Sequence, residues 1–122
     1  MNEEAFIFDT YALIEILKKN PRYEPYIRKR MIINDFIFAE FCYKLIKDTV
    51  AHVPEYLYEC ASCINHAASD TIKEAMAFRI HNKKKNLSMT DCISYIIARR
   101  LGIKFLTGDK EFEYLDNVEF VK

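Results

Sequence analysis

Short apolar runs alternate along this chain with longer segments whose apolar residues recur at helical spacing. Ala5–Phe8 is a continuous apolar run, which is typical of a parallel strand covered on both faces. A helix is expected from Thr10 until Asn20-Pro21 ends it, and a short helical piece begins at Pro25. Residues 31–33 predict a second strand, and Asn34 or Asp35 can cap the helix after it.

The second half continues the alternation, with one ambiguous segment. Helices are predicted from Pro54 and over residues 71–81, the latter after a Ser69-Asp70 cap. Residues 63–65 between them fit either a continued helix or a short strand, and we favour the strand. Ser88 or Thr90 can cap a further helix that Gly102 ends, and residues 103–106 and 118–121 predict the last two strands.

This alternation of strands and helices predicts an α/β fold with three layers, in which helices flank a central, mainly parallel sheet of about four to five strands. The length of 122 residues indicates a single domain spanning residues 1–122. No apolar run approaches the ~20 residues that cross a bilayer, and no basic-then-apolar leader precedes the first strand. We therefore expect a cytoplasmic protein with no membrane partner.

The net charge and the cysteines limit how this chain could bind nucleic acid or zinc. The formal net charge is zero, so any contact with nucleic acid must come from local clusters such as residues 28–30, residues 83–85 or Arg99-Arg100. Cys60 and Cys63 form a C-x-x-C pair with no second paired set of ligands, which favours core thiols over a zinc site.

Four acidic residues stand out from the apolar segments around them. Asp9 directly follows an apolar strand, Glu40 interrupts an apolar helix face, Asp91 begins a helix, and Asp109 leaves another strand. Each has an alternative explanation as a helix cap, a solvated side chain, a partner of the helix dipole or a turn residue. Because the carboxyl ends of parallel strands share one edge of a sheet, Asp9 and Asp109 are nevertheless expected to meet.

Clustered carboxylates require neutralisation. Two of them ~4 Å apart repel by about 4 kcal/mol at an effective dielectric constant near 20. Oxygen ligands select hard divalent ions, so Mg or Mn is the expected cofactor, and phosphodiester hydrolysis is the matching chemistry. The chain has only two glycines, which excludes a P-loop and a G-x-G-x-x-G turn.

The segments FIFDTYALIEIL, FIFAEFCYKL and SMTDCISYIIARRLGIKFLTGDKEF together resemble a PIN domain, and within that superfamily the VapC-type toxins of toxin–antitoxin modules. The resemblance implies a PIN-like fold and a metal-dependent endoribonuclease. By motif, Asp9, Glu40, Asp91 and Asp109 correspond to the acidic quartet that is both catalytic and metal-binding in the family. Thr10 and Thr107 match its supporting hydroxyls, whereas Tyr11 replaces a serine that often follows.

The resemblance also implies partners: an RNA substrate, a small antitoxin and a second copy of the chain in a homodimer. The candidate phosphate contacts are Arg79, Lys83, Lys84 and Lys85, and a merely solvated lysine run remains an alternative. An alternative function is a non-catalytic PIN-like module that binds RNA or protein. A phosphatase of another α/β family is disfavoured, because Asp9 has no second aspartate two residues on.

Overall fold

A four-stranded parallel sheet forms the centre of the computed structural model, which describes residues 4–48 and 53–122. The strands are β1 (Ala5–Phe8), β2 (Arg30–Ile32), β3 (Lys104–Thr107) and β4 (Val118–Phe120), and their order in the sheet is β2-β1-β3-β4. All three neighbouring pairs are parallel. The predicted α/β fold with a parallel sheet is therefore confirmed.

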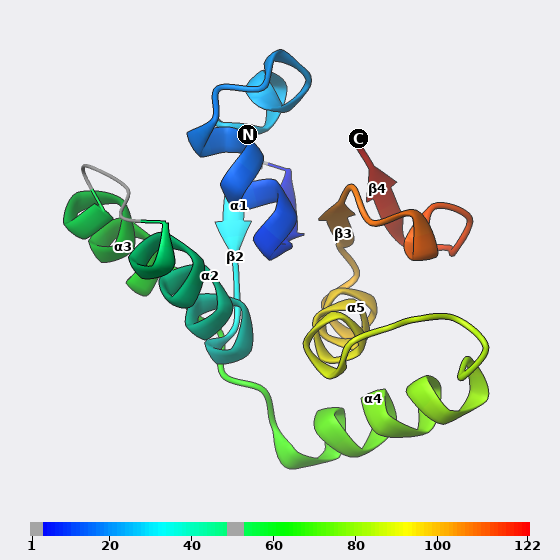
Figure 1. Cartoon of the computed structure of the whole chain (residues 1–122). Helices are drawn as coiled ribbons and strands as arrows, with labels where there is room; N and C mark the ends of the chain where they lie inside the picture. The colour runs from blue at the N-terminus through cyan, green and yellow to red at the C-terminus, as the bar shows by residue number, and fades with distance from the viewer. Residues whose placement is uncertain (1–3, 49–52) are drawn as a thin grey trace.

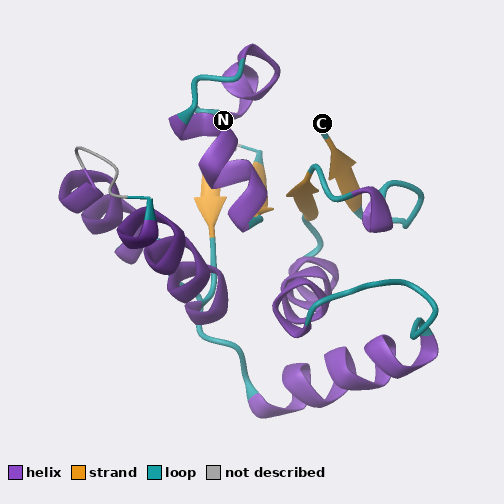
Figure 2. Ribbon diagram, in the orientation of Figure 1, coloured by secondary structure: helices purple, strands orange, loops and turns teal. Residues whose placement is uncertain are grey.

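Helices cover this sheet (Figures 1 and 2). They are α1 (Thr10–Leu17), α2 (Asp35–Lys47), α3 (Val53–Ala61), α4 (Ser69–His81) and α5 (Met89–Leu101), with short 3-10 helices at Pro21–Tyr26 and Lys110–Phe112. Both α1 and α5 contact β1 and β3, while α4 packs on α5 and α3 packs on α2. Figure 1 shows α5 lying between α4 and the strands. No helix within residues 4–48 and 53–122 has the length and apolar content needed to cross a membrane.

The helix α5 is the central element of the core. Every residue from Cys92 to Ala98 is buried, so the helix is covered on all sides rather than along one stripe. The buried side chains of β1 (Phe6, Ile7, Phe8) and β3 (Phe105, Leu106) belong to the same apolar cluster. This packing fixes the carboxyl ends of β1 and β3 relative to the start of α5.

Most helix ends follow the sequence signals. Asn34 caps α2 by accepting the N–H groups of Phe36 and Ile37, and Gly102 ends α5 in the left-handed conformation at φ 69°. Asp9 rather than Thr10 is the cap of α1. No side chain caps α4, where Ala68 occupies the cap position and Asp70 lies within the first turn.

Other expectations need correction. The favoured strand at residues 63–65 is a single parallel bridge between Ile33 and Ile64, because only that pair aligns with the sheet edge. Helical spacing of apolar residues predicts that Leu101 of α5 and Ile46 of α2 face the core, but they are 46% and 71% exposed. Both lie in the last turn of a helix, beyond the part that neighbouring elements cover.

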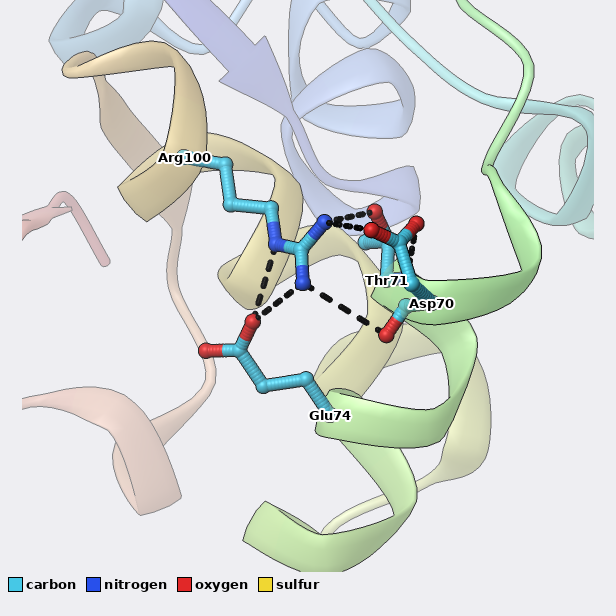
Figure 3. A network of polar contacts seen from close by, with 4 residues as sticks. All are labelled: Asp70, Thr71, Glu74 and Arg100. Atoms are coloured by element: carbon cyan, nitrogen blue, oxygen red, sulfur yellow. Dashed lines mark hydrogen bonds and ion pairs between the residues drawn. The ribbon is translucent and has the colours of Figure 1, made fainter.

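An arginine links α4 to α5 at the surface (Figure 3). Arg100 donates from Nε to Glu74 Oε1 at 2.8 Å and from Nη1 to Asp70 Oδ2 at 3.0 Å and Thr71 Oγ1 at 2.9 Å. These hydrogen bonds and the positive charge hold the pKa of Asp70 below its usual value. The Arg100 cluster, defined as Asp70, Thr71, Glu74 and Arg100, thus pairs two acids with one cation.

Candidate active site

A cavity of about 490 Å³ opens at the carboxyl ends of β1 and β3. All four singled-out acids line it: Asp9 after β1, Glu40 from α2, Asp91 from the first turn of α5 and Asp109 after β3. The remaining lining residues are Thr10, Tyr11, Lys44, Ser88, Gly108, Lys110 and Lys122. The fold therefore gathers side chains from both ends of the chain into what we call the acidic cavity.

Asp9 is the most deeply placed acid, at 5% exposure. Its Oδ1 accepts the backbone N–H of Thr10 at 2.8 Å, and its Oδ2 accepts the hydroxyl of Thr107 at 2.7 Å. Both carboxylate oxygens are therefore oriented by the protein. Burial raises the pKa of Asp9 to about 6, against the lowering effect of these two hydrogen bonds, and the charges of Glu40 and Asp109 raise it further.

Two buried threonines connect Asp9 to its neighbours. The hydroxyl of Thr10 donates to Glu40 Oε1 at 2.8 Å, which ties α1 to α2. The hydroxyl of Thr107 accepts the backbone N–H of Asp109 at 3.1 Å while donating to Asp9. Thr10 and Thr107, both predicted as supporting residues, therefore hold three of the four acids in place.

Asp91 lines the acidic cavity from the first turn of α5. Its backbone N–H donates to the hydroxyl of Ser88, the helix cap, at 3.0 Å. Burial raises the pKa of Asp91 to about 8, and the charges of Asp9, Asp109 and Glu40 contribute in the same direction. Both raised pKa values thus arise first from burial, and repulsion among the four carboxyl groups adds to it.

No cation relieves this repulsion within the described part of the chain. Among residues 4–48 and 53–122, none of the four acids forms an ion pair within 4.0 Å, although Lys44, Lys110 and Lys122 line the same cavity. Lys122 lies instead over the ring of Tyr11, at 5.7 Å from its centroid. Within these ranges the cavity thus combines four acidic groups with three ammonium groups that form no ion pair to them.

The donor set suits a hard divalent cation, since four carboxylates offer only oxygen ligands. As they stand, however, no three acid, histidine or cysteine side chains in residues 4–48 and 53–122 are arranged to hold a metal ion. Mutual repulsion separates carboxylates in the absence of a cation, and the oxygen donors and the shared cavity fit a divalent ion that would draw them together.

Gly108 and Tyr11 form one wall of the acidic cavity. A Cβ atom at position 108 would lie 2.2 Å from Tyr11 Cε1 and 2.7 Å from the carbonyl oxygen of Val121. Only glycine fits there, which lets the aromatic ring pack directly on the backbone that leads to Asp109. Tyr11, found where the resemblance suggested a serine, therefore contributes shape rather than a small hydroxyl.

The predicted RNA contacts lie outside the acidic cavity. Arg79, Lys83 and Lys85 line a second cavity of about 420 Å³ with Met76, Ile80, Asn86 and Leu87. Lys84 is exposed and lines neither cavity. The loop before α5 separates the two hollows, because Leu87 lines one and Ser88 the other.

The sequence interpretation missed the three lysines of the acidic cavity. Each had a positional signal: Lys44 lies one helical turn after Glu40, Lys110 follows Asp109, and Lys122 comes two residues after β4. Strand β4 is parallel to β3, so its carboxyl end reaches the same sheet edge. The nearby acids Glu111, Glu113 and Asp116 do not line the cavity.

Comparison with known proteins adds independent information. The sequence model of the PIN domain matches residues 6–118. No curated protein sequence gives a significant match. Three solved structures share the fold at low identity. A Klebsiella pneumoniae toxin–antitoxin complex has a TM-score of 0.74 and 18% identity, with coverage of 93% of this chain and 95% of the other.

The other two structures give similar values. A sarcin–ricin-loop-cleaving VapC toxin of Mycobacterium tuberculosis has a TM-score of 0.72 and 16% identity, covering 98% of this chain and 100% of that one. A Pyrobaculum aerophilum protein has a TM-score of 0.70 and 18% identity, covering 97% and 90%. At such identities the likeness shows that the fold is shared.

Proposed function

Because this chain belongs to the PIN domain family, we propose that it is a Mg- or Mn-dependent endoribonuclease. The proposal includes the role of toxin in a toxin–antitoxin module, residence in the cytoplasm, and a single domain over residues 1–122. The observation that carries it is the acidic cavity, in which four carboxylates from four separate segments face one space without a cationic partner among the described residues.

In this proposal Asp9, Glu40, Asp91 and Asp109 hold the metal. When bound, a divalent cation supplies positive charge that activates water and stabilises the departing oxygen. Only ionised carboxylates bind a cation, so Asp9 and Asp91 release their protons on loading. Their raised pKa values make metal affinity increase with pH between about 6 and about 8.

The threonines give the site its order. Thr107 holds one oxygen of Asp9 and the backbone of Asp109, so the ends of β1 and β3 cannot move apart without breaking a buried hydrogen bond. Thr10 fixes Glu40 in the same way. Preorganisation of this kind places the charged groups before the substrate arrives, which lowers the cost of the reaction.

The surroundings suit a polyanionic substrate. Lys44, Lys110 and Lys122 in the acidic cavity provide positive charge for phosphates, and Arg79, Lys83, Lys84 and Lys85 provide more beyond the loop before α5. Two proteins of the same fold support the wider role: one is a toxin–antitoxin complex, and another is a toxin that cleaves the sarcin–ricin loop. A small antitoxin partner and a homodimer are part of the proposal.

The test is cleavage of single-stranded and structured RNA by the purified protein with Mn²⁺, with Mg²⁺ and with EDTA. Asp9→Asn should reduce the rate at least about a hundredfold, since even residues that only support a metal ligand are worth 10- to 100-fold. Glu113→Gln removes an exposed acid outside the cavity and should leave the rate unchanged.

Cleavage that persists in EDTA or in Asp9→Asn would contradict the proposal, as would the absence of cleavage on every RNA. RNA binding without cleavage by the unsubstituted protein would favour the alternative of a non-catalytic binding module.

A further inference from the structure

The acidic cavity continues into a shallow hollow on α2. That hollow, about 430 Å³, is lined by Ala39, Glu40, Tyr43 and Lys44, so it shares Glu40 and Lys44 with the cavity. We call it the α2 hollow. Glu40 and Lys44 therefore lie on the common border of the two hollows, so a strand that leaves the acidic cavity on this side meets Lys44 first.

Tyr43 presents an exposed aromatic ring in the α2 hollow. It is 66% exposed on the outer face of α2, although most aromatic side chains of the described residues are buried or half-buried. Lys47 lies over its ring at 6.0 Å from the centroid, and Lys44 lies next to it in the sequence. The exposed ring of Tyr43 and the ammonium groups of Lys47 at the ring and Lys44 in the same hollow provide a stacking surface and positive charge.

Lys44 has no acidic partner within residues 4–48 and 53–122, even though Glu40 lies one helical turn before it. Glu40 Oε1 accepts instead from Thr10. The positive charge at the junction of the two hollows is therefore left for an external anion. Together with Tyr43, this matches single-stranded nucleic acid, in which backbone phosphates and flat bases alternate.

We propose that the substrate strand leaves the acidic cavity over α2, with a phosphate on Lys44 and the next base stacked on Tyr43. This inference rests on the proposed RNA cleavage and names the path of the substrate beyond the scissile bond. Lysine is a point charge and a stacked ring accepts any base, so this contact positions the strand without reading its sequence.

A protein partner is the rival occupant of this face. Phe36 and Ile46 are also exposed on α2, and with Tyr43 they form an apolar stripe at spacings of seven and three residues. Neither Phe36 nor Ile46 lines the α2 hollow, whereas both Tyr43 and Lys44 do. The lining residues that this hollow shares with the acidic cavity, and the lysines near it, therefore favour RNA.

The experiment measures RNA binding apart from cleavage. Every variant carries Asp9→Asn and is kept in EDTA, and the probe is a fluorescent single-stranded oligoadenylate of about ten nucleotides. Tyr43→Ala should weaken binding by about 5- to 100-fold, the range observed when a stacked aromatic is truncated. Tyr43→Phe keeps the ring and should bind like the parent. Tyr114→Ala, which removes a ring that is 89% exposed elsewhere, is the matched control.

Lys44→Gln gives a second, independent readout. Loss of one phosphate contact should decrease the slope of log K against log salt by about 0.7 for a single strand. Lys73→Gln, an exposed lysine on α4 outside both hollows, should leave the slope unchanged. Light scattering of each variant reports the oligomeric state in the same samples.

Equal binding by Tyr43→Ala and Tyr114→Ala would overturn the inference, as would a loss of affinity shared by Tyr43→Ala and Tyr43→Phe, which would indicate a hydroxyl contact. Loss of self-association in Tyr43→Ala with unchanged RNA affinity would assign the face to protein instead. If the unsubstituted protein cleaves RNA but Tyr43→Ala and Lys44→Gln bind RNA normally, only this path fails. If the unsubstituted protein cleaves no RNA, the proposed function fails and this inference fails with it.

Discussion

Two groups of acidic side chains in this protein have opposite electrostatics. In the Arg100 cluster, Asp70 and Glu74 share one guanidinium at the surface, and the pKa of Asp70 lies below its usual value. In the acidic cavity, four carboxylates crowd together without a cationic partner among the described residues, and the pKa values of Asp9 and Asp91 rise to about 6 and about 8. The same residue types thus serve two different ends.

This difference distinguishes a structural contact from a candidate functional site. In an exposed ion pair between two helices the opposite charges neutralise each other, and the pair contributes little beyond fixing the orientation of the helices. A buried group of like charges is unfavourable until something neutralises it, so its presence requires a reason other than stability. The fold accommodates the acidic cavity because the buried threonines and the packed core around α5 hold the carboxylates in position.

The largest expected effect is stabilisation by metal. Mn²⁺ or Mg²⁺ at about 100 times its dissociation constant should raise the free energy of unfolding by about 3 kcal/mol. Chemical denaturation at about pH 8 with metal or EDTA measures this. Asp91→Asn should abolish the shift, while Arg100→Gln, which breaks the other acidic group, should retain it. A full shift in Asp91→Asn would show that the cavity acids do not bind the ion.

Next in size is the pH dependence of stability without metal. In the folded protein Asp9 and Asp91 keep their protons to a higher pH than in the unfolded chain, where carboxyl groups lose them near pH 3.8. The stabilisation that follows from this difference is fully present below pH 3.8. It is lost as the pH rises through about 6 and about 8. In EDTA the free energy of unfolding should fall by about 1 kcal/mol per pH unit over the upper part of this window.

Denaturation midpoints at a series of pH values check this slope. Asp91→Asn removes the group that titrates near pH 8 and should flatten the upper part of the curve, whereas Glu113→Gln should not. A metal-free stability that rises between pH 6 and pH 8 would contradict the raised pKa values.

The smallest effect is expected at the Arg100 cluster. Arg100→Gln should lower the Tm by at most a few degrees, because exposed ion pairs contribute little. Its RNA cleavage should match that of the parent, and the small loss of stability should shrink at high salt. A large loss of RNA cleavage by a folded Arg100→Gln variant would show that the α4–α5 contact affects the acidic cavity. The Arg100 cluster would then not be purely structural.

The sequence predicts the positions of the acids that follow strands better than the positions of the other residues of the site. The pattern of residues is enough to bring Asp9 and Asp109 together, because parallel strands share an edge and each acid follows a buried run. Glu40 can be singled out from the sequence but not placed, since its position depends on a hydrogen bond from Thr10 on another helix. Periodicity carries no information about such contacts between elements.

Proximity in sequence is misleading for the basic residues. Arg79, Lys83 and Lys85 precede Asp91 closely, yet the end of α4 and the loop after it place them in a separate cavity. Lys122 is far in sequence from every acid in the quartet except Asp109, yet the parallel arrangement of β3 and β4 returns it to the acidic cavity. The path of the chain between elements decides which cavity a basic side chain lines, and no local sequence pattern predicts that path.

The close packing at Gly108 sets an asymmetric limit on how this site can drift during evolution. The aromatic ring at position 11 could be exchanged for a smaller side chain, which would leave only a wider opening. Such an exchange would not free position 108, because the backbone oxygen of Val121 still lies 2.7 Å from where a Cβ would stand. Descendants of this chain can therefore lose Tyr11, but they cannot replace the glycine either before or after that exchange.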